Sequence, residues 1–557
     1  MHRNQSLFFL FALWLGFAAQ ATAQSLAHIH VNPANANSDD ANSAAESAPL
    51  KTLAAAVDRA TKNRKAGRGS HIFLHPGIYR EGLWRHFDAS QSGLPLVIEA
   101  VEPGMAIVTG ADIVDVKWTP SKRAGIYQHE LFEQWQGWRA RPIHAGWRSE
   151  INESNFTEIG RRRENIWING ERYEQKLLLE DVYEQEKTFG IFKGTVIIHP
   201  PTGFDPNNAD IEIGVRDILL RLQGWNDFTL RGVTFVRSAS GSPVAACQTK
   251  PRNSSNSCVM RGEQPAASVS NAALGIVEQR NVLVEDVELY ENNWFGLYLW
   301  DTKDVVVRNV VANENGADGI TGGRSERLLL SGSVTNGNNR RGYAGGLTHW
   351  APGQKFLYLI DSDIVNHTAM NNWSRGFWLD MGNNNVRIDN LHSCNNLEDG
   401  IFIEANIGPI TLENSTVCNN GSNGVKLAAS RGVTLRNVTT FGNALAQIDL
   451  SGLQRDRKVD GEVINNENYV FENLTVTNTN SRQLLIHYAM EERFWDQLTA
   501  PGSFIAHNNQ YSSAGNEKPF LITPGEYSGF DRWRSRTGCQ EAGSVFDGKS
   551  VPNCNSE

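Results

Sequence analysis

A short apolar strand that opens with glycine recurs along the middle of this 557-residue chain. Copies of it occupy residues 296–300, 319–323, 346–350, 376–380, 400–404 and 424–428, and residues 447–451 follow without the glycine. The last residues of these strands lie 23 to 30 positions apart, and a second apolar strand, such as residues 410–414, follows several of them. Self-similarity at such a period, with Asn, Gly and Asp at the corners, is typical of a solenoid.

We therefore predict an all-β chain that folds as a right-handed parallel β-helix, in which each turn contributes two or three short strands. Stacking the turns places Asn396 over Asn420 and near Asn443. Side-chain amides in such a stack can bond to one another and to corner groups that no sheet partner reaches. The sequence thus predicts an asparagine ladder along one corner.

Five segments follow from the pattern. Residues 1–23 resemble a signal peptide, with Arg3, an apolar run over 7–19 and small residues at 21–23, which predicts a secreted or periplasmic protein. Residues 24–112 should form an N-terminal cap and the first turns, and residues 113–217, which carry the hairpin signal Asn169-Gly170, a β-rich insertion. Residues 218–485 should form the main helix and residues 486–557 a tail that covers its open end.

Charge and cysteine content limit the partners. A net charge of -9 argues against nucleic acid, which calls for clustered Lys and Arg, and no later apolar run reaches the length of a bilayer span. The six cysteines fall into sequence-adjacent pairs without metal-binding spacing. Cys394 and Cys418 occupy equivalent positions, as stacked thiols or as a bridge between turns. We expect no metal and no cofactor.

Alternation within each strand determines which side chains face outward. The first and third residues after the opening glycine are mostly aliphatic and should fill the core, so that the second and fourth face out. The predicted second row is Tyr298, Thr321, Thr348, Trp378, Phe402, Lys426 and Asp449. The predicted fourth row is Trp300, Gly323, Trp350, Asp380, Glu404, Ala428 and Ser451. One outer face would then present aromatic rings and two carboxylates on consecutive turns.

Asp380 and Glu404 are the predicted catalytic pair. Neighbouring parallel strands lie about 4.8 Å apart, so the two carboxyl groups should fall within the roughly 5 to 5.5 Å that retaining glycosidases use. Two acids this close should have different pKa values, which gives a protonated acid beside an ionised nucleophile.

Other side chains of this face are candidates for substrate binding. Trp350, Trp378 and Phe402 could stack on a sugar. Lys426 could be a counter-ion, a substrate contact or a plain surface lysine. His349 falls at an inward position, which favours a buried histidine over a substrate ligand.

Two strings carry a family resemblance. Residues 378–387 (WLDMGNNNVR) and 399–409 (DGIFIEANIGP) resemble the active-site turns of glycoside hydrolase family 120, the β-xylosidase-type β-helix enzymes of the pectate-lyase-like superfamily. The close match covers about residues 345–425. The resemblance implies that Asp380 is the nucleophile, that Glu404 is the acid/base, and that a β-rich insertion interrupts the helix early.

The predicted function is a secreted glycoside hydrolase that cleaves a plant- or microbe-derived oligo- or polysaccharide. Two alternatives stay open. A polysaccharide lyase of the same fold would use a basic residue such as Lys426, and a non-catalytic carbohydrate-binding β-helix would use neither carboxylate. A homo-oligomer, in which the insertion of one subunit closes the groove of another, also stays open.

Overall fold

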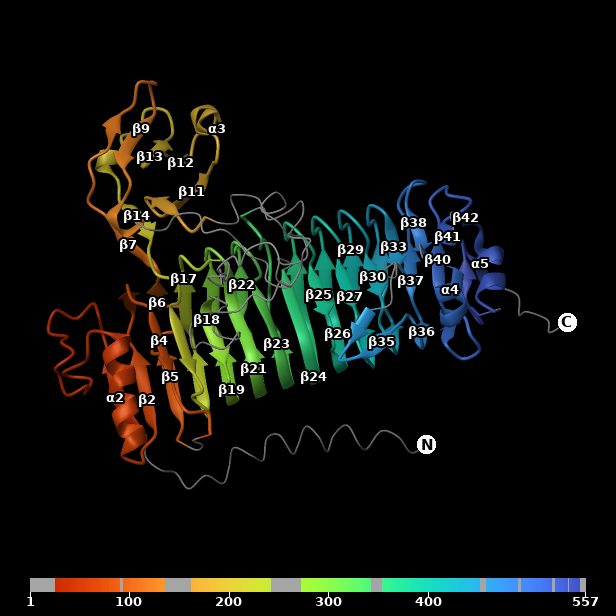
Figure 1. Cartoon of the computed structure of the whole chain (residues 1–557), viewed down its shortest axis with the longest axis horizontal. Coiled ribbons are helices and arrows are strands. Elements are labelled where there is room, and N and C mark those ends of the chain that lie inside the picture. The colour runs from red at the N-terminus through yellow and green to blue at the C-terminus, as the bar shows by residue number, and fades with distance from the viewer. Residues whose placement is uncertain are drawn as a thin grey trace, which may run out of the picture.

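A computed structural model describes residues 26–90, 94–135, 162–241, 272–341, 353–450, 457–488, 492–522, 526–538 and 540–550. It confirms the predicted fold class, a parallel β-helix with an early β-rich insertion. Each complete turn contributes strands to three faces, which we name the site face, the second face and the third face. Figure 1 shows the turns stacked side by side along the long axis.

The strands of each face pair in parallel along the axis. The site face contains β4 (Leu83–His86), β15 (Leu220–Gln223), β18 (Ala272–Val277), the first parts of β21 (Phe295–Arg308), β23 (Ile320–Ser331) and β24 (Gln354–Met370), β25 (Phe377–Asp380), β27 (Ile401–Glu404), β30 (Val425–Ala428), β33 (Ala446–Asp449), β38 (Leu484–His487) and β41 (Phe520–Ile522). The second face contains β1 (Ala27–Val31), β2 (Ser70–Leu74), β5 (Leu96–Ala100), β16 (Phe228–Arg231), β19 (Arg280–Glu285), later parts of β21, β23 and β24, the start of β26 (Asn384–Cys394), β28 (Ile410–Glu413), β31 (Val433–Arg436), β36 (Tyr469–Glu472) and β39 (Phe504–His507). The third face contains β3 (Gly77–Tyr79), β6 (Ala106–Thr109), β17 (Val233–Val236), β20 (Glu288–Tyr290), β22 (Val311–Asn313), the ends of β24 and β26, β29 (Thr416–Cys418), β32 (Thr439–Phe441), β37 (Thr475–Thr477), β40 (Gln510–Ser512) and β43 (Val545–Phe546).

The predicted cap is helix α2 (Leu53–Lys65), which begins after Thr52. The Thr52 side chain accepts a hydrogen bond from the Ala55 amide, as a good N-cap residue does. Apolar residues of one helix face, among them Leu53 and Val57, are buried against the first turns. One continuous core then follows the axis to Trp533 near the other end.

Ladders of polar side chains stabilise the corners. The predicted contacts of Asn396, Asn420 and Asn443 are confirmed, with amide-to-carbonyl distances of 3.0 and 2.8 Å. The ladder is longer than predicted, because Asn372 and earlier asparagines continue it toward the N-terminus. Cys394 and Cys418 form a disulfide between neighbouring turns, which decides between the two options that the sequence left open.

The insertion is a second, separate sheet. Its strands are β7 (Ala111–Ile113), β8 (Thr119–Pro120), β9 (Tyr127–Glu130), β10 (Ile166–Ile168), β11 (Glu171–Gln175), β12 (Thr188–Phe192), β13 (Thr195–His199) and β14 (Ile211–Gly214), with helix α3 (Leu179–Glu184) and two 3-10 turns, η1 (Glu133–Trp135) and η3 (Pro206–Asn208). Asn169 and Gly170, both with positive φ, form the predicted turn of the β10–β11 hairpin. The sheet stands out from the N-terminal part of the β-helix (Figure 1). Strand β4 precedes the insertion in the sequence and β15 follows it, and these two strands pair in register within the β-helix.

The coil continues beyond the predicted end near residue 485. Parallel pairing extends through β39, β40, β41 and β43, because the later strands keep apolar residues at the inward positions. Two helices lie at this end, α4 (Glu492–Leu498) and α5 (Phe530–Arg536), together with the antiparallel strands β42 (Glu526–Ser528) and β44 (Lys549–Ser550). Before β36, a hairpin leaves the coil, formed by β34 (Arg457–Val459) and β35 (Glu462–Ile464). Within the described ranges, no helix combines the length and the apolar character that a membrane crossing requires.

Candidate active site

Strands β25 and β27 position the two predicted catalytic carboxylates. Phe377 and Leu379 point into the core and pair with Ile401 and Ile403 of the next turn, and all four are fully buried. The pairing extends to Leu379 and Ile403, and the next residue of each strand is Asp380 or Glu404. Neighbouring parallel strands lie about 4.8 Å apart. Trp378 and Phe402 belong to a separate cluster outside this core, which confirms the predicted alternation, but the outer row is buried as well and does not face solvent. The two acids are the last residues of neighbouring strands of the site face.

Both carboxylates are withdrawn from solvent, with Asp380 6% and Glu404 7% exposed. Acidic side chains are rarely buried to this degree unless they are paired or serve a function. Two outward-facing surface acids would instead be hydrated. The burial favours a functional site over a solvated pair.

A lysine that the sequence analysis did not select contacts Asp380. Lys355 Nζ lies 2.9 Å from Asp380 Oδ2, and both side chains are 8% exposed. The same nitrogen lies 3.5 Å from the centre of the Trp378 ring. Asp380 Oδ1 is buried and has no hydrogen-bond partner.

Lys355 was missed because the repeat pattern assigned this turn's site-face strand to residues 346–350, whereas Gln354–Leu357 of β24 take that place between β23 and β25. The turn between β23 and β25 is made by the first residues of β24: Thr321 pairs with Lys355, and Lys355 with Trp378. Lys355 thus takes the position predicted for Thr348. Residues 346–350 fit the repeat in sequence but lie outside the described residues, and β24 carries a polar side chain, Gln354, at its inward position.

The same correction removes Trp350 from the fourth row. Leu357 stands there instead, in register with Asp380. Trp350 and His349 lie outside the described residues, so their predicted roles stay predictions.

The two aromatic residues of the predicted site face each other. Trp378 and Phe402 stack with ring centres 5.3 Å apart and an interplanar angle of 27°, and both are buried. Arg375 lies 4.9 Å from the Trp378 ring centre and 5.1 Å from that of Phe402. We call these two stacked rings the aromatic wall. Lys355 and Arg375 lie against the ring faces, so protein groups already occupy much of the surface of the wall.

A second set of ionic groups flanks this wall. Arg375 Nε lies 3.1 Å from Asp399 Oδ2 and Arg375 Nη1 3.5 Å from Glu398 Oε2. Burial raises the pKa of Glu398, with a partial offset from Arg375. Burial acts in the same direction on Asp399, but the charges of Arg375 and Lys426 and the hydrogen bonds from Asn423 outweigh it, and the pKa of Asp399 is lowered.

Lys426 lies one turn beyond Phe402, as predicted. Its Nζ is 5.2 Å from the Phe402 ring centre and 3.8 Å from Asp449 Oδ2. Asp449 also contacts His487 Nδ1, at 2.9 Å. Lys426 is therefore a partly buried member of an ionic row.

Asp318 is a further buried acid near Lys355. It is 1% exposed. Burial raises the pKa of Asp318 well above its usual range, and the Thr321 side chain and the charge of Lys355 offset only part of this. Asp318, Arg375 and Asp399 each directly precede the opening glycine of a turn. A charged residue directly before the opening glycine of a turn was thus a feature of the sequence that could have indicated these site residues, but the alternation rule considers only the residues after the glycine.

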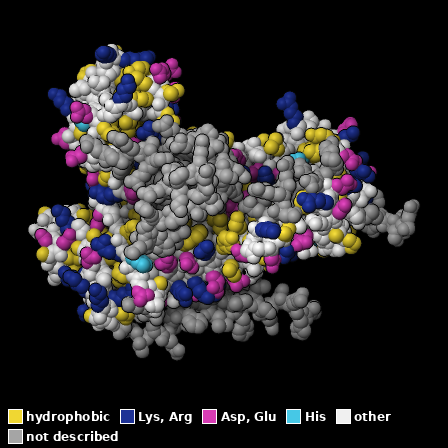
Figure 2. Space-filling model, viewed as in Figure 1, with side chains coloured by type: hydrophobic (Ala, Val, Ile, Leu, Met, Phe, Trp, Pro, Cys, Tyr) yellow, Lys and Arg dark blue, Asp and Glu magenta, His cyan; other side chains and the backbone are white. Residues whose placement is uncertain are grey.

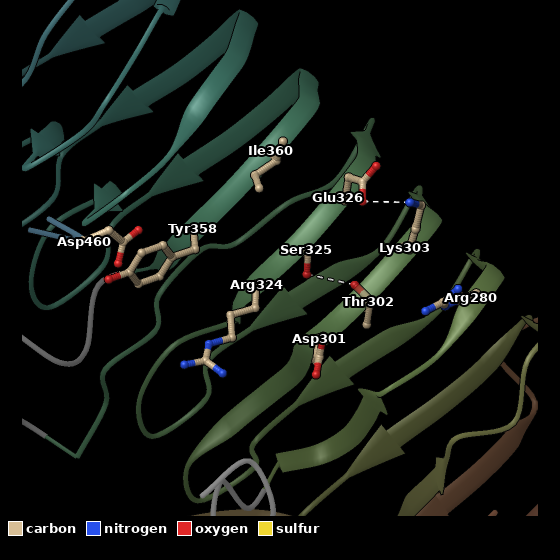
Figure 3. A pocket seen from close by; sticks show the side chains of 10 residues that line it. All are labelled: Arg280, Asp301, Thr302, Lys303, Arg324, Ser325, Glu326, Tyr358, Ile360 and Asp460. Carbon is tan, nitrogen blue, oxygen red and sulfur yellow. Dashed lines mark hydrogen bonds and ion pairs between the residues drawn. The ribbon is translucent and has the colours of Figure 1, made fainter. Parts of the chain in front are cut away.

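A cavity of about 490 Å³ lies around the corner from the carboxylates, between the site face and the second face. Figure 3 shows its lining, which includes Tyr358, Arg324 and the pairs Lys303–Glu326 and Thr302–Ser325. Lys303 Nζ lies 2.9 Å from Glu326 Oε2 and the two hydroxyl oxygens lie 2.8 Å apart. Its three basic and three acidic side chains balance in charge. Basic and acidic groups are likewise interspersed over the described surface in Figure 2.

Within the ranges described above, no three His, Cys, Asp or Glu side chains lie close enough together to hold an ion. The groups gathered around Asp380 and Glu404 are instead two ammonium or guanidinium side chains and two rings. Such a site is equipped for proton transfer and nucleophilic attack by carboxylates.

Comparisons with known proteins agree with the fold. No protein-family model and no curated protein matches the sequence. The structure described as the complex of XylC with xylose is similar, with a TM-score of 0.60 and 14% identity over 89% of this chain and 86% of that one. The A-module of the mannuronan C-5 epimerase AlgE4 from Azotobacter vinelandii (TM-score 0.47, 15% identity, 89% and 99% covered) and a protein described as a glycoside hydrolase (0.45, 10%, 94% and 96%) are more distant. At these identities the likeness shows a shared parallel β-helix.

Proposed function

We propose that this chain is a retaining glycoside hydrolase in which Asp380 is the nucleophile and Glu404 the general acid/base. The observation that carries the proposal is that two buried acids, Asp380 and Glu404, are the last residues of the paired strands β25 and β27 on neighbouring turns. An inverting enzyme needs about 6.5 to 9.5 Å between its carboxyl groups, to leave room for a water molecule. Neighbouring turns are too close for that arrangement, which favours retention.

The contacts of the two acids support their assignment to different roles. Lys355 lies against Asp380, and an ionised carboxylate is what a nucleophile requires. Glu404 ends the next strand, where it can protonate the leaving oxygen of the same sugar. Trp378 and Phe402 shield both groups from water, which strengthens the electrostatic interactions between them.

The substrate class rests on two likenesses. The strings around Asp380 and Glu404 resemble those of the β-xylosidase-type family 120 enzymes, and the similar XylC structure contains xylose. We therefore propose an oligo- or polysaccharide substrate with a β-xyloside as the first sugar to test. The Cys394–Cys418 disulfide supports a secreted or periplasmic location, since disulfides persist in oxidising compartments.

The lyase alternative has less support from these contacts. A lyase base must be neutral when it removes a proton, whereas the lysine at the centre of the site face is ion-paired with Asp380. Lys426 is also paired, with Asp449. A non-catalytic carbohydrate-binding protein would have no need of two adjacent buried acids.

The test combines a substrate screen with two matched variants. Purified protein is offered aryl xyloside, arabinoside, glucoside, fucoside and galactoside, and uronate polymers in parallel, with release of the aryl group and absorbance of unsaturated products as readouts. Proton NMR of the first product formed gives the anomeric outcome. Asp380→Asn and Glu404→Gln should each remove most hydrolysis while the thermal melting profile stays close to that of the wild type. Unsaturated products, or full activity in both variants, would overturn the proposal.

A further inference from the structure

We propose that Lys355 is the counter-ion of the nucleophile: it holds Asp380 Oδ2, leaves Oδ1 to attack the sugar, and stabilises the carboxylate when the sugar departs. The inference rests on the proposed function, and it names a positioning residue that neither the repeat pattern nor the family strings indicate. It also assigns different tasks to the two oxygens of one side chain.

The geometry separates these two oxygens. Lys355 Nζ lies 2.9 Å from Oδ2, while Oδ1 has no hydrogen-bond partner although it is buried. Buried polar atoms without partners are rare and point to a functional constraint. Because Oδ1 makes no hydrogen bond, it is the oxygen that we assign to the bond with the anomeric carbon.

The backbone keeps the lysine in place. Lys355 stands in β24 directly beside Trp378 of β25, two residues before Asp380 in the paired strand. The ammonium group lies over the face of the Trp378 ring, at 3.5 Å from its centre, which is a favourable position for a cation. Backbone register and ring contact together fix the direction from which the charge approaches Asp380.

The other basic side chains near the two rings contact different acids. Arg375 is engaged with Asp399 and Glu398, and Lys426 with Asp449. Asp318 lies near Lys355, but burial raises its pKa well above the usual range and so favours its uncharged form. The contact of Lys355 with Asp380 is direct, at 2.9 Å between Nζ and Oδ2.

The chemistry shows when this charge matters. In the first step, Oδ1 bonds to the anomeric carbon as the glycosidic bond breaks, and Glu404 gives its proton to the leaving oxygen. Asp380 is then an uncharged ester. In the second step, water attacks the anomeric carbon, the carbon–Oδ1 bond breaks with its electron pair returning to the carboxylate, and Glu404 takes a proton from the water. Lys355 stabilises this returning negative charge, so it assists the departure of Asp380.

The test measures the second step in Lys355→Met. With the 2,4-dinitrophenyl β-xyloside, or the dinitrophenyl glycoside that the screen identifies, leaving-group departure is fast and release of the enzyme ester limits turnover. We expect kcat to fall about 100-fold, the size typical for the loss of one preorganised electrostatic contact. KM should fall with it, and a burst of dinitrophenolate equal to the enzyme concentration should appear. Lys355→Arg, which keeps the charge, should restore most of kcat.

Lys303→Met is the matched control. It removes a lysine that is also 2.9 Å from an acid of the adjacent turn, Glu326, but this pair is about one-third exposed and lies around the corner. We expect its kcat and KM to equal those of the wild type. Lys355→Gln offers a second uncharged variant that keeps a hydrogen-bond donor, in case the Met variant does not fold.

The outcomes separate the two hypotheses. Inversion of configuration by the wild type would refute the retaining mechanism itself. Retention in the wild type, together with folded uncharged variants that show no burst and an unchanged KM, would refute only the role of Lys355.

Discussion

The side-chain amide of Asn396 donates a hydrogen bond to Oδ1 of Asn420 on the next turn, at 3.0 Å. Asn396 Oδ1 in turn accepts from both nitrogens of Asn372, and its amide also donates to the Ala369 carbonyl. Because the side chain is buried, Asn396→Ala leaves several of these groups without partners. We expect the free energy of unfolding to fall by about 3 kcal/mol, measured by denaturant titration.

An exposed ladder at another corner provides the control. Asn414 Nδ2 donates to Asp389 Oδ1 at 2.8 Å, but its partners can turn to water instead. Its φ of +51° calls for glycine as the replacement. Asn414→Gly should cost less than about 1 kcal/mol, and an equal loss in both variants would contradict a special role for the buried ladder.

Gln354 is a polar side chain inside the core. It is fully buried, and neither its Oε1 nor its Nε2 has a hydrogen-bond partner. Gln354→Met keeps the shape of the side chain and removes the cost of burying an unbonded amide. We expect the variant to be more stable by about 1 to 2 kcal/mol. A lower melting temperature would show that the amide is bonded in solution.

His367 should make the protein sensitive to acid. Burial lowers the pKa of His367 from 6.5 to about 3, with a small offset from the backbone at Ser333. In the unfolded chain His367 therefore binds a proton below about pH 6.5, whereas in the folded chain it binds one only below about pH 3. The contribution of His367 to the free energy of unfolding is fully present above pH 6.5. It is lost progressively as the pH falls, by up to about 1.4 kcal/mol per pH unit.

His367→Gln keeps a partner for the Thr335 hydroxyl, which lies 3.1 Å from His367 Nε2. Melting temperatures of the two proteins are compared between pH 7.5 and 4. The variant should lose less stability over this range than the wild type. Parallel curves would mean that His367 takes up its proton in the folded state as easily as in the unfolded one.

Glu404→Ala should show the rescue pattern of an acid/base residue. Glycosides with poor leaving groups need a proton from Glu404 and should react about 100-fold or more slowly, while dinitrophenyl glycosides should form the covalent intermediate readily. Azide can then replace the activated water. We expect azide to accelerate turnover and to yield a glycosyl azide of retained configuration, detected by NMR. Asp380→Ala should give no retained azide product.

The fold was predictable because its signal is periodic. Leu379 and Ile403 are inward by the same rule that sets Asp380 and Glu404 on the outer side, and the structure confirms the alternation in these strands. The rule failed between residues 323 and 357, where a longer connection separates the strands. Residues 346–350 fit the pattern better than the start of β24 does, because Gln354 violates the expectation of an apolar inward residue.

The ionic groups of the site were less accessible to sequence reasoning. Lys355 could be placed against Asp380 only once the register of β24 was known. Arg375 and Asp399 precede the opening glycines, a position to which the alternation rule gives no direction. Their partners come from other turns, and a one-residue change of register would exchange every such contact.

The pairing of Leu83 with Leu220 across the insertion has a consequence for biosynthesis. Most later turns close against a neighbour only 23 or 24 residues further on, as Asn396 and Asn420 do. Strand β4 instead pairs with β15, more than a hundred residues further along the chain, and in an exported protein it must remain unpaired on that side until the whole intervening segment has crossed the membrane. The N-terminal turns are therefore exposed longest, and shortening the insertion to a few residues should relieve this delay and raise the yield of folded protein.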